Sequence, residues 1–95
     1  MFTLKEISDS LSMPFEGDGT ISILGPSEPK NADKNHLALA MNERFLNDLQ
    51  KGNALTALLI KGTNWRNLGL KGALFVERPR YAVAKINTLF EDKSI

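Results

Sequence analysis

The chain has 95 residues and no cysteine, so one small domain must fold on its hydrophobic core, without disulfides or cysteine-bound metal. Its 12 basic and 11 acidic residues give a net charge of +1 and are scattered along the sequence, which argues against a nucleic-acid partner. No apolar run is long enough to span a bilayer, and the N-terminus lacks a secretory signal pattern. We therefore expect a cytoplasmic protein that does not insert into a membrane.

The first predicted element is a helix that begins after Thr3 and ends at Pro14. Thr3 and Glu6 have the Thr-x-x-Glu spacing of a capping box, and apolar residues at positions 4, 7 and 11 give one buried face. Residues 16–19 predict a glycine turn, and residues 20–24 predict a strand that stops at Gly25-Pro26. Residues 26–35 predict a polar loop.

The middle of the chain predicts a strand, a helix and a second strand. Residues 37–41 alternate large and small apolar side chains, which is typical of a short buried strand. Asn42 is a good helix N-cap, and Gly52 is expected to close that helix as its C′ residue. Residues 55–60 are almost uninterruptedly apolar, the pattern of a strand covered on both faces of a parallel sheet. We expect a right-handed crossover between the two strands.

The last third of the chain predicts a polar connection over residues 61–71, with one helical turn at residues 64–67, and a strand at residues 73–76. Pro79 is well placed at the first position of a final helix whose end is expected to fray. The element order predicts an α/β fold, with a small mixed or mostly parallel sheet flanked by helices. Residues 1–95 are expected to form a single domain. The buried face of the last helix is predicted to be Ala82, Ile86, Leu89 and Phe90.

Catalytic chemistry is hard to assemble from these residues. The chain has one histidine, His36, and no cysteine. It also has no glycine pattern of the nucleophile-elbow type, so no nucleophilic triad is indicated. Acidic residues do not have calcium-loop spacing, and no Gly-rich phosphate loop is present. We therefore expect no catalytic residue, no metal and no cofactor in this chain.

Two strand-to-helix junctions are the candidate binding sites, because ligands of open α/β sheets bind at the carboxyl ends of strands. At the first junction, Asn42 offers two donors and an acceptor that complement a pyrimidine edge, and Phe45 offers a flat face. At the second, Arg78 and Arg80 open the last helix and are suited to phosphate. The structural alternatives are a simple helix cap, a core phenylalanine and two exposed arginines. Trp65 is either a contact residue or folded back over the sheet.

Several segments then carry a resemblance to a known family. They are the opening helix at residues 2–7, the turn at residues 16–19, the run at residues 37–45, the strand at residues 54–60 and the run at residues 75–81. In this order and spacing, the chain resembles the N-terminal domain of the UDP-3-O-acylglucosamine N-acyltransferase (LpxD) family of lipid A biosynthesis. The approach to the last strand, residues 69–74, is most similar to the alphaproteobacterial branch.

The resemblance implies a uracil site at Leu39, Asn42 and Phe45. Arg78 and Arg80 remain the phosphate candidates that their place at the start of the last helix indicates. The family has an aromatic residue, an asparagine and a tyrosine at the first three positions, so Asn42 agrees while Leu39 and Phe45 depart. The family usually has an asparagine where this chain has Arg78. The implied fold resembles that of the Mur ligase N-terminal domain.

The same resemblance implies that the whole protein transfers a 3-hydroxyacyl group from acyl carrier protein to UDP-3-O-acylglucosamine. Members of the family continue into a trimeric left-handed β-helix that carries the catalytic histidine, and no such repeat occurs here. We therefore expect this chain to bind the substrate without catalysing transfer. The parent protein is expected to be a homotrimer that contacts the carrier protein elsewhere, and this chain a monomer.

Two alternatives remain at this point. A Mur ligase-type domain would also bind a UDP-sugar. Such domains usually have an Asp-Gly-His element after the strand-helix junction, whereas this chain has the sequence Asn-Glu-Arg-Phe at residues 42–45. A docking module without ligand would explain the departures at Leu39 and Arg78.

Overall fold

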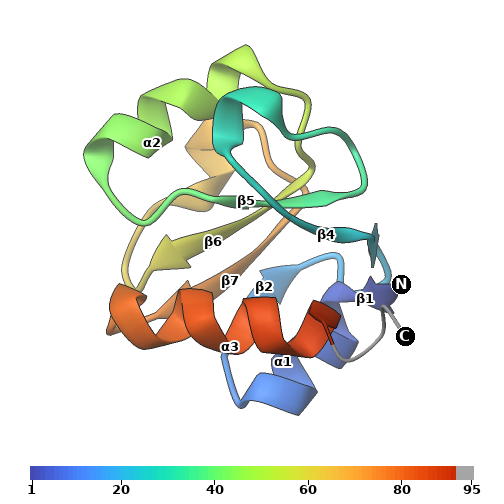
Figure 1. The fold of residues 1–95 in the computed structure, drawn as a ribbon. Helices are drawn as coiled ribbons and strands as arrows, with labels where there is room; N and C mark the ends of the chain where they lie inside the picture. Colours follow the sequence, from blue (N-terminus) through green and yellow to red (C-terminus); the bar gives the residue numbers. More distant parts are fainter. Residues whose placement is uncertain (92–95) are drawn as a thin grey trace.

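A five-stranded sheet crosses the middle of the molecule in the computed structural model, which describes residues 1–91 (Figure 1). The strand order is β2-β7-β6-β5-β4. Strands β4, β5, β6 and β7 run parallel to one another, and β2 pairs antiparallel with β7. The prediction of a small, mixed and mostly parallel sheet is confirmed. The strands are β2 (Phe15–Gly17), β4 (Gly25–Ser27), β5 (His36–Leu39), β6 (Thr56–Ile60) and β7 (Gly72–Val76).

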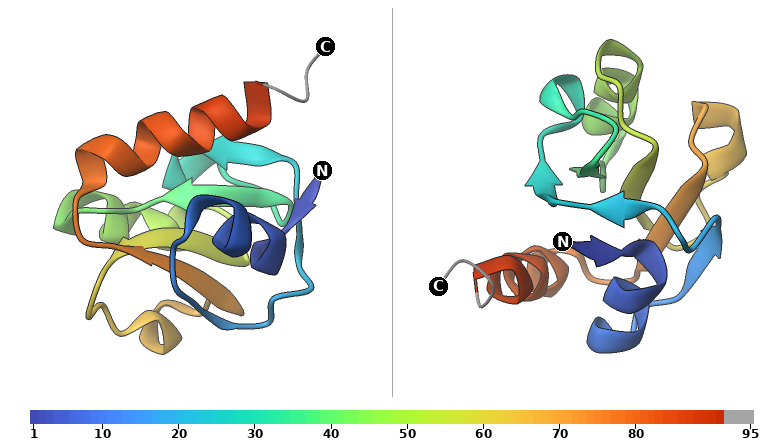
Figure 2. Two further views of the ribbon diagram at one scale, coloured as in Figure 1. Left: turned by 90° about the horizontal axis from the view of Figure 1, so that it is seen from below. Right: turned by 90° about the vertical axis from the view of Figure 1, so that its right-hand side faces the viewer.

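Helices cover both faces of this sheet (Figures 1 and 2). Helices α1 (Leu4–Leu11) and α3 (Pro79–Glu91) lie on one face, and α2 (Glu43–Asp48) lies on the other. Three short 3₁₀ turns, η1 (Pro29–Asn31), η2 (Leu49–Lys51) and η3 (Trp65–Leu68), lie in the connections. The helical turn expected near residue 65 is therefore present. None of the helices in residues 1–91 is long and apolar enough to cross a bilayer.

The core is divided by the sheet into two clusters, because successive side chains of a strand point to opposite faces. Leu58 of β6 packs with Leu4 and Ile86 in what we call the α1/α3 cluster. Its neighbours Ala57 and Leu59 pack with Leu49 in the α2 cluster. All of β6 except its last residue is buried, as its apolar run predicts.

Helix α1 begins as its sequence indicates. The hydroxyl oxygen of Thr3 accepts the Glu6 N–H at 3.1 Å, and the Glu6 carboxylate accepts the Thr3 N–H at 2.9 Å. The helix ends at Leu11, where Ser12 adopts a left-handed φ of 55°, before Pro14 is reached. The rings of Phe2 and Phe90 pack edge to face, with their centroids 5.4 Å apart. This contact joins the start of the chain to the end of α3.

Residues 15–27 differ most from the prediction. The expected turn begins as strand β2, and the expected strand at residues 20–24 is only β3 (Ser22–Ile23), which pairs with β1 (Phe2–Thr3) in a separate two-stranded ribbon. Gly25-Pro26 does not stop a strand but lies within β4, at the edge of the main sheet. An edge strand tolerates proline because one side of its backbone needs no ladder partner.

Gly52 follows α2 for a different reason from the one expected. Its φ is −106°, so it is not a left-handed C′ residue, and α2 passes into the turn η2 before the chain reaches it. A Cβ at Gly52 would collide with the backbone oxygen of Pro29. The glycine is therefore required by the close approach of two backbone segments.

The remaining elements agree with the prediction within two residues. The strands expected at residues 37–41, 55–60 and 73–76 are β5, β6 and β7, and the last helix begins at Pro79. In that helix Ala82 and Ile86 are buried, and Leu89 and Phe90 are half-buried. Of the end expected to fray, residues 92–95 lie outside the described residues.

We expect Gly17→Ala to destabilise the protein more than Gly62→Ala. Both glycines have a positive φ, 91° and 94°, which costs about 1–2 kcal/mol for alanine. A Cβ at Gly17 would also lie 2.7 Å from the Cα of Gly72 and collide with the Lys71 oxygen, whereas nothing lies within 4 Å of one at Gly62. Overpacking should raise the Gly17 cost to about 3 kcal/mol or more. Urea denaturation measures both, and equal losses would contradict the steric argument.

Candidate functional site

The carboxyl ends of the parallel strands β5, β6 and β7 meet at one edge of the sheet, where ligands of such folds bind. Strand β5 leads through Asn42 into α2, β6 leads into a turn at Lys61, and β7 leads through Arg78 into α3. Both junctions singled out in the sequence therefore lie at the same edge, separated by β6.

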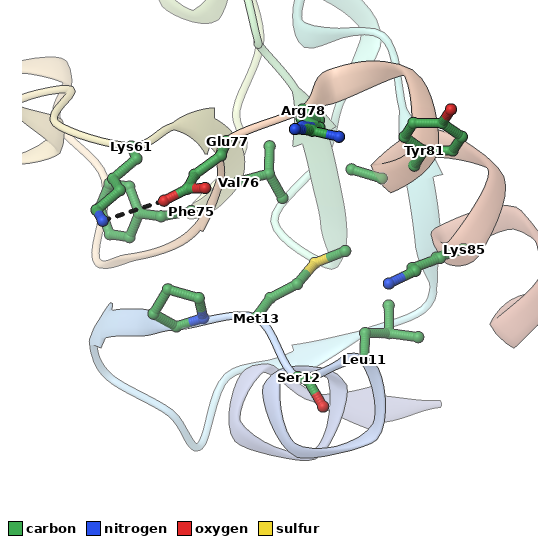
Figure 3. A pocket seen from close by; sticks show the side chains of 12 residues that line it. Leu11, Ser12, Met13, Lys61, Phe75, Val76, Glu77, Arg78, Tyr81 and Lys85 are labelled. Carbon is green, nitrogen blue, oxygen red and sulfur yellow. Dashed lines mark hydrogen bonds and ion pairs between the residues drawn. The ribbon is translucent and has the colours of Figure 1, made fainter.

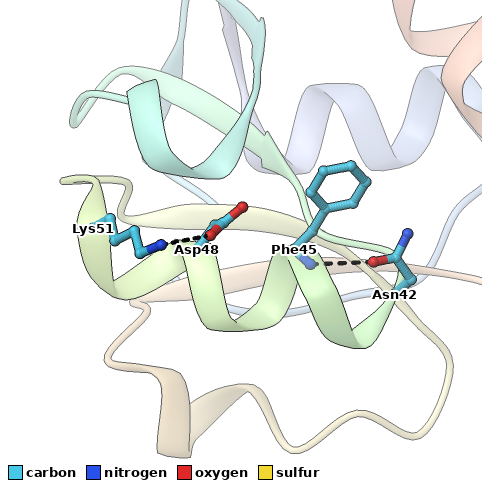
Figure 4. A network of polar contacts seen from close by, with 4 residues as sticks. All are labelled: Asn42, Phe45, Asp48 and Lys51. Carbon is cyan, nitrogen blue, oxygen red and sulfur yellow. Dashed lines mark hydrogen bonds and ion pairs between the residues drawn. The ribbon is translucent and has the colours of Figure 1, made fainter.

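Asn42 caps helix α2, as predicted. Its backbone is extended, with φ −149° and ψ 167°, and its side-chain oxygen accepts the N–H of Phe45 at 3.1 Å (Figure 4). The side chain is exposed, and neither amide N–H has a hydrogen-bond acceptor among the described groups of residues 1–91, which do not include the Glu43 side chain. The cap thus occupies one lone pair of the amide and leaves both donors for solvent or a ligand.

Leu39 and Phe45 are half-buried, and each contributes to a different core cluster. Leu39 packs against the α1/α3 cluster, while Phe45 packs against the α2 cluster. Figure 4 shows the Phe45 ring beside the amide group of Asn42, on the first turn of α2. The two side chains therefore approach the sheet edge from opposite faces, and their core-filling role is observed directly.

A cleft of about 540 Å³ opens at the second junction, between the end of α1, the end of β7 and the first turns of α3 (Figure 3). Arg78 lines this cleft, whereas Arg80 is exposed and does not line it. The sequence argument missed Tyr81 and Lys85, which line the cleft with Arg78. Their spacing of three and four residues, which places side chains on one helix face, is the signal that would have found them.

The charges around the cleft are mostly positive. Lys61 forms an ion pair with Glu77 at 3.2 Å, so these two charges offset each other. The side chains of Arg78 and Lys85 form no hydrogen bond or ion pair within the part of the chain that the structure describes. The cleft therefore presents two unpaired cations to a ligand.

Trp65 is folded back over the sheet, which is the second of the two interpretations that its sequence position allows. Only 8% of the residue is exposed, and it belongs to the α2 cluster. Its indole N–H lies 3.5 Å from a carboxylate oxygen of Glu16, and the guanidinium of Arg66 lies 5.4 Å from the ring centroid. A second cavity of about 370 Å³ lies beside it, lined also by Lys61 and Thr63.

His36 and Asp18 line neither of these two cavities. His36 lies at the amino end of β5, where its Nδ1 accepts the Asp33 N–H at 3.0 Å. Asp18 accepts hydrogen bonds from the hydroxyl and the backbone N–H of Thr20, and these lower the pKa of its carboxyl group. No group of three His, Cys, Asp or Glu residues within residues 1–91 is placed to hold a metal ion.

Comparison with known proteins identifies relatives over nearly the whole chain. A UDP-3-O-acylglucosamine N-acyltransferase of Ruegeria pomeroyi is 32% identical over 90 residues, and one of Paracoccus denitrificans is 33% identical over 89 residues. The chain is homologous to one segment of the UDP-3-O-acylglucosamine N-acyltransferases. The matches cover 95% and 94% of this chain but only 25% and 24% of the two relatives. No family model matches the chain.

The cap predicts how substitutions at Asn42 affect stability. Asn42→Ala should lower the free energy of unfolding by about 1 kcal/mol, because the Phe45 N–H loses its acceptor. Asn42→Asp keeps an oxygen in the same place and should change stability by less than about 0.5 kcal/mol. Urea denaturation followed by the fluorescence of Trp65, the only tryptophan, measures both. A large loss in the aspartate variant would contradict the assignment of the cap.

Proposed function

We propose that this chain is the N-terminal, nucleotide-sugar-binding domain of a UDP-3-O-acylglucosamine N-acyltransferase, and that Asn42 recognises the uracil ring. The observation that carries the proposal is the exposed amide of Asn42, which retains both N–H donors at the ligand-binding edge of the sheet. The homology to two enzymes of this name supports the choice of ligand.

The uracil edge presents a carbonyl, an N–H and a second carbonyl. In the proposed complex, the Asn42 amide donates to one carbonyl and its oxygen accepts from the ring N–H through the lone pair that the Phe45 N–H does not use. Leu39 and Phe45, which belong to clusters on opposite faces of the sheet, supply an aliphatic contact and an aromatic contact to the two sides of the ring.

The diphosphate is proposed to extend along the sheet edge towards α3. Strands β5 and β7 are separated only by β6, so their ends are roughly 10 Å apart at about 4.8 Å per strand. This distance is comparable with the length of a nucleoside diphosphate. Arg78 and Arg80, both exposed, are the cations that follow β7 and would neutralise the phosphate charges.

The whole protein is proposed to form an amide by attack of the glucosamine nitrogen of UDP-3-O-acylglucosamine on the thioester of a 3-hydroxyacyl carrier protein, with the thiol as leaving group. This chain would hold the acceptor and take no part in the chemical step. The catalytic and trimer-forming β-helix, and the contact with acyl carrier protein, would lie in the three quarters of the relatives that this chain does not cover. A cytoplasmic location and a fold like the Mur ligase N-terminal domain belong to the same proposal.

Uridine binding tests the role of the Asn42 donors. Wild-type protein should show saturable shifts in amide NMR signals near Asn42 on titration with uridine. Asn42→Asp, which keeps the cap but has no N–H to donate, should weaken binding about tenfold. Uridine is uncharged, so the effect is not a repulsion between the new carboxylate and phosphate.

His36→Ala is the matched control, because His36 lies at the opposite end of β5 from Asn42. It should leave uridine binding unchanged. Unaltered binding by Asn42→Asp would refute the proposed recognition. Absence of binding by the wild type, to uridine and to UDP alike, would favour a docking module without a ligand.

The oligomeric state is a separate expectation. If trimer formation resides in the part of the relatives that these 95 residues do not match, the 95 residues by themselves should be monomeric. Size-exclusion chromatography with light scattering should then give a mass near 10.5 kDa. A stable trimer would contradict the proposed division of labour.

A further inference from the structure

We propose that the cleft between α1, β7 and α3 is a second binding site, whose ligand is an amphiphilic anion with an unbranched apolar chain and a carboxylate or phosphate-monoester head. This inference goes beyond the proposed recognition of uracil and does not depend on it. It rests on the apolar lining of the cleft, its unpaired cations and its size. The cleft shares Arg78 with the proposed phosphate contacts, so the experiments below use uridine, which carries no phosphate.

The inner wall of the cleft is apolar. Met13 and Val76 are 7% and 8% exposed, and Ala82 is 3% exposed, so the wall is an extension of the α1/α3 cluster. Leu11 adds a half-buried side chain at the lower margin (Figure 3). Methionine and leucine adapt to a flexible alkyl chain better than to a rigid plane, and Figure 3 shows Met13 extending into the cleft.

The rim of the cleft is cationic along α3. Arg78 and Lys85 are separated by seven residues, or about 10 Å along a helix axis, with the exposed ring of Tyr81 between them. Figure 3 shows the amino group of Lys85 directed inward, opposite Arg78. Neither cation has a partner among residues 1–91, and the only acidic group lining the cleft, Glu77, is paired with Lys61. An anionic head at this rim would be attracted by both cations.

The size of the cleft also suits such a ligand. Its volume of about 540 Å³ lies within the range of about 300–1,000 Å³ for small-molecule sites. A bound alkyl chain would cover the apolar wall, and each fully buried methylene strengthens binding by about fourfold. Apolar contact and charge are therefore both expected to contribute to the binding affinity. A simple anion site would depend on charge alone.

Titration of the 95-residue chain with octyl phosphate tests the proposal, with amide NMR signals of Val76 and Ala82 as the readout. Octyl phosphate should bind at least tenfold more tightly than inorganic phosphate, which lacks the chain, and than octanol, which lacks the charge. Octanoate in place of octyl phosphate shows whether a carboxylate or a phosphate head is preferred, and tighter binding of either supports the site.

Lys85→Gln should weaken octyl phosphate about three- to fivefold and leave octanol unaffected. Lys34→Gln is the matched control, because it removes the same charge from an exposed position just before the amino end of β5. It should have no effect on octyl phosphate binding. Equal effects of the two variants, or equal binding of octyl phosphate and either simpler probe, would overturn the proposal.

The two proposed sites are separable by experiment. Asn42→Asp should leave octyl phosphate binding intact, and Lys85→Gln should leave uridine binding intact. A negative result in the uridine titrations therefore refutes only the uracil site, and a negative result in the octyl phosphate titrations refutes only the cleft. Competition between uridine and octyl phosphate for the same NMR signals would contradict the assignment of two sites.

Discussion

The parallel register of β5, β6 and β7 is the constraint on which the rest of this structure depends. It aligns Ala38, Ala57 and Ala73 in one row across three strands, and Leu39, Leu58 and Leu74 in the next row, which faces the other way. The alanine row lets α2 and its following turn lie close to the sheet, and the leucine row forms the centre of the α1/α3 cluster. A slip of one residue would exchange the two rows and leave each layer with side chains of the wrong size.

The same register brings the candidate ligand groups to one edge. Because the three strands are parallel, the residues that follow them emerge side by side. Those that follow β5 and β7 open helices α2 and α3 while remaining exposed. Asn42 is an example, since its amide oxygen stabilises α2 by accepting the Phe45 N–H while its amide nitrogen can still donate hydrogen bonds to a ligand. Its observed structural role and its proposed binding role therefore do not exclude each other, and an aspartate at this position separates them.

The two faces of the sheet differ in what they offer to a ligand. On the α2 face, short alanine side chains, Leu49 and Trp65 belong to one buried cluster. On the other face, α1 ends at Leu11 and α3 starts at Pro79, so neither helix covers the end of β7 and a cleft remains between them. The early end of α1 follows from the left-handed Ser12 and from Pro14, which prevent the helix from continuing across the opening.

The sequence by itself determined the elements whose signals are local. The capping box of α1, the cap at Asn42, the proline that opens α3 and the apolar run of β6 are each decided by neighbours along the chain, and all are observed. Tertiary structure decided the short strands β2 and β4, because their pairing rests on backbone hydrogen bonds to distant partners and leaves no side-chain pattern in three residues. It also decided the cleft and the requirement for glycine at position 52, since a space between helices and a collision with the Pro29 oxygen both arise only when segments far apart in sequence are packed together.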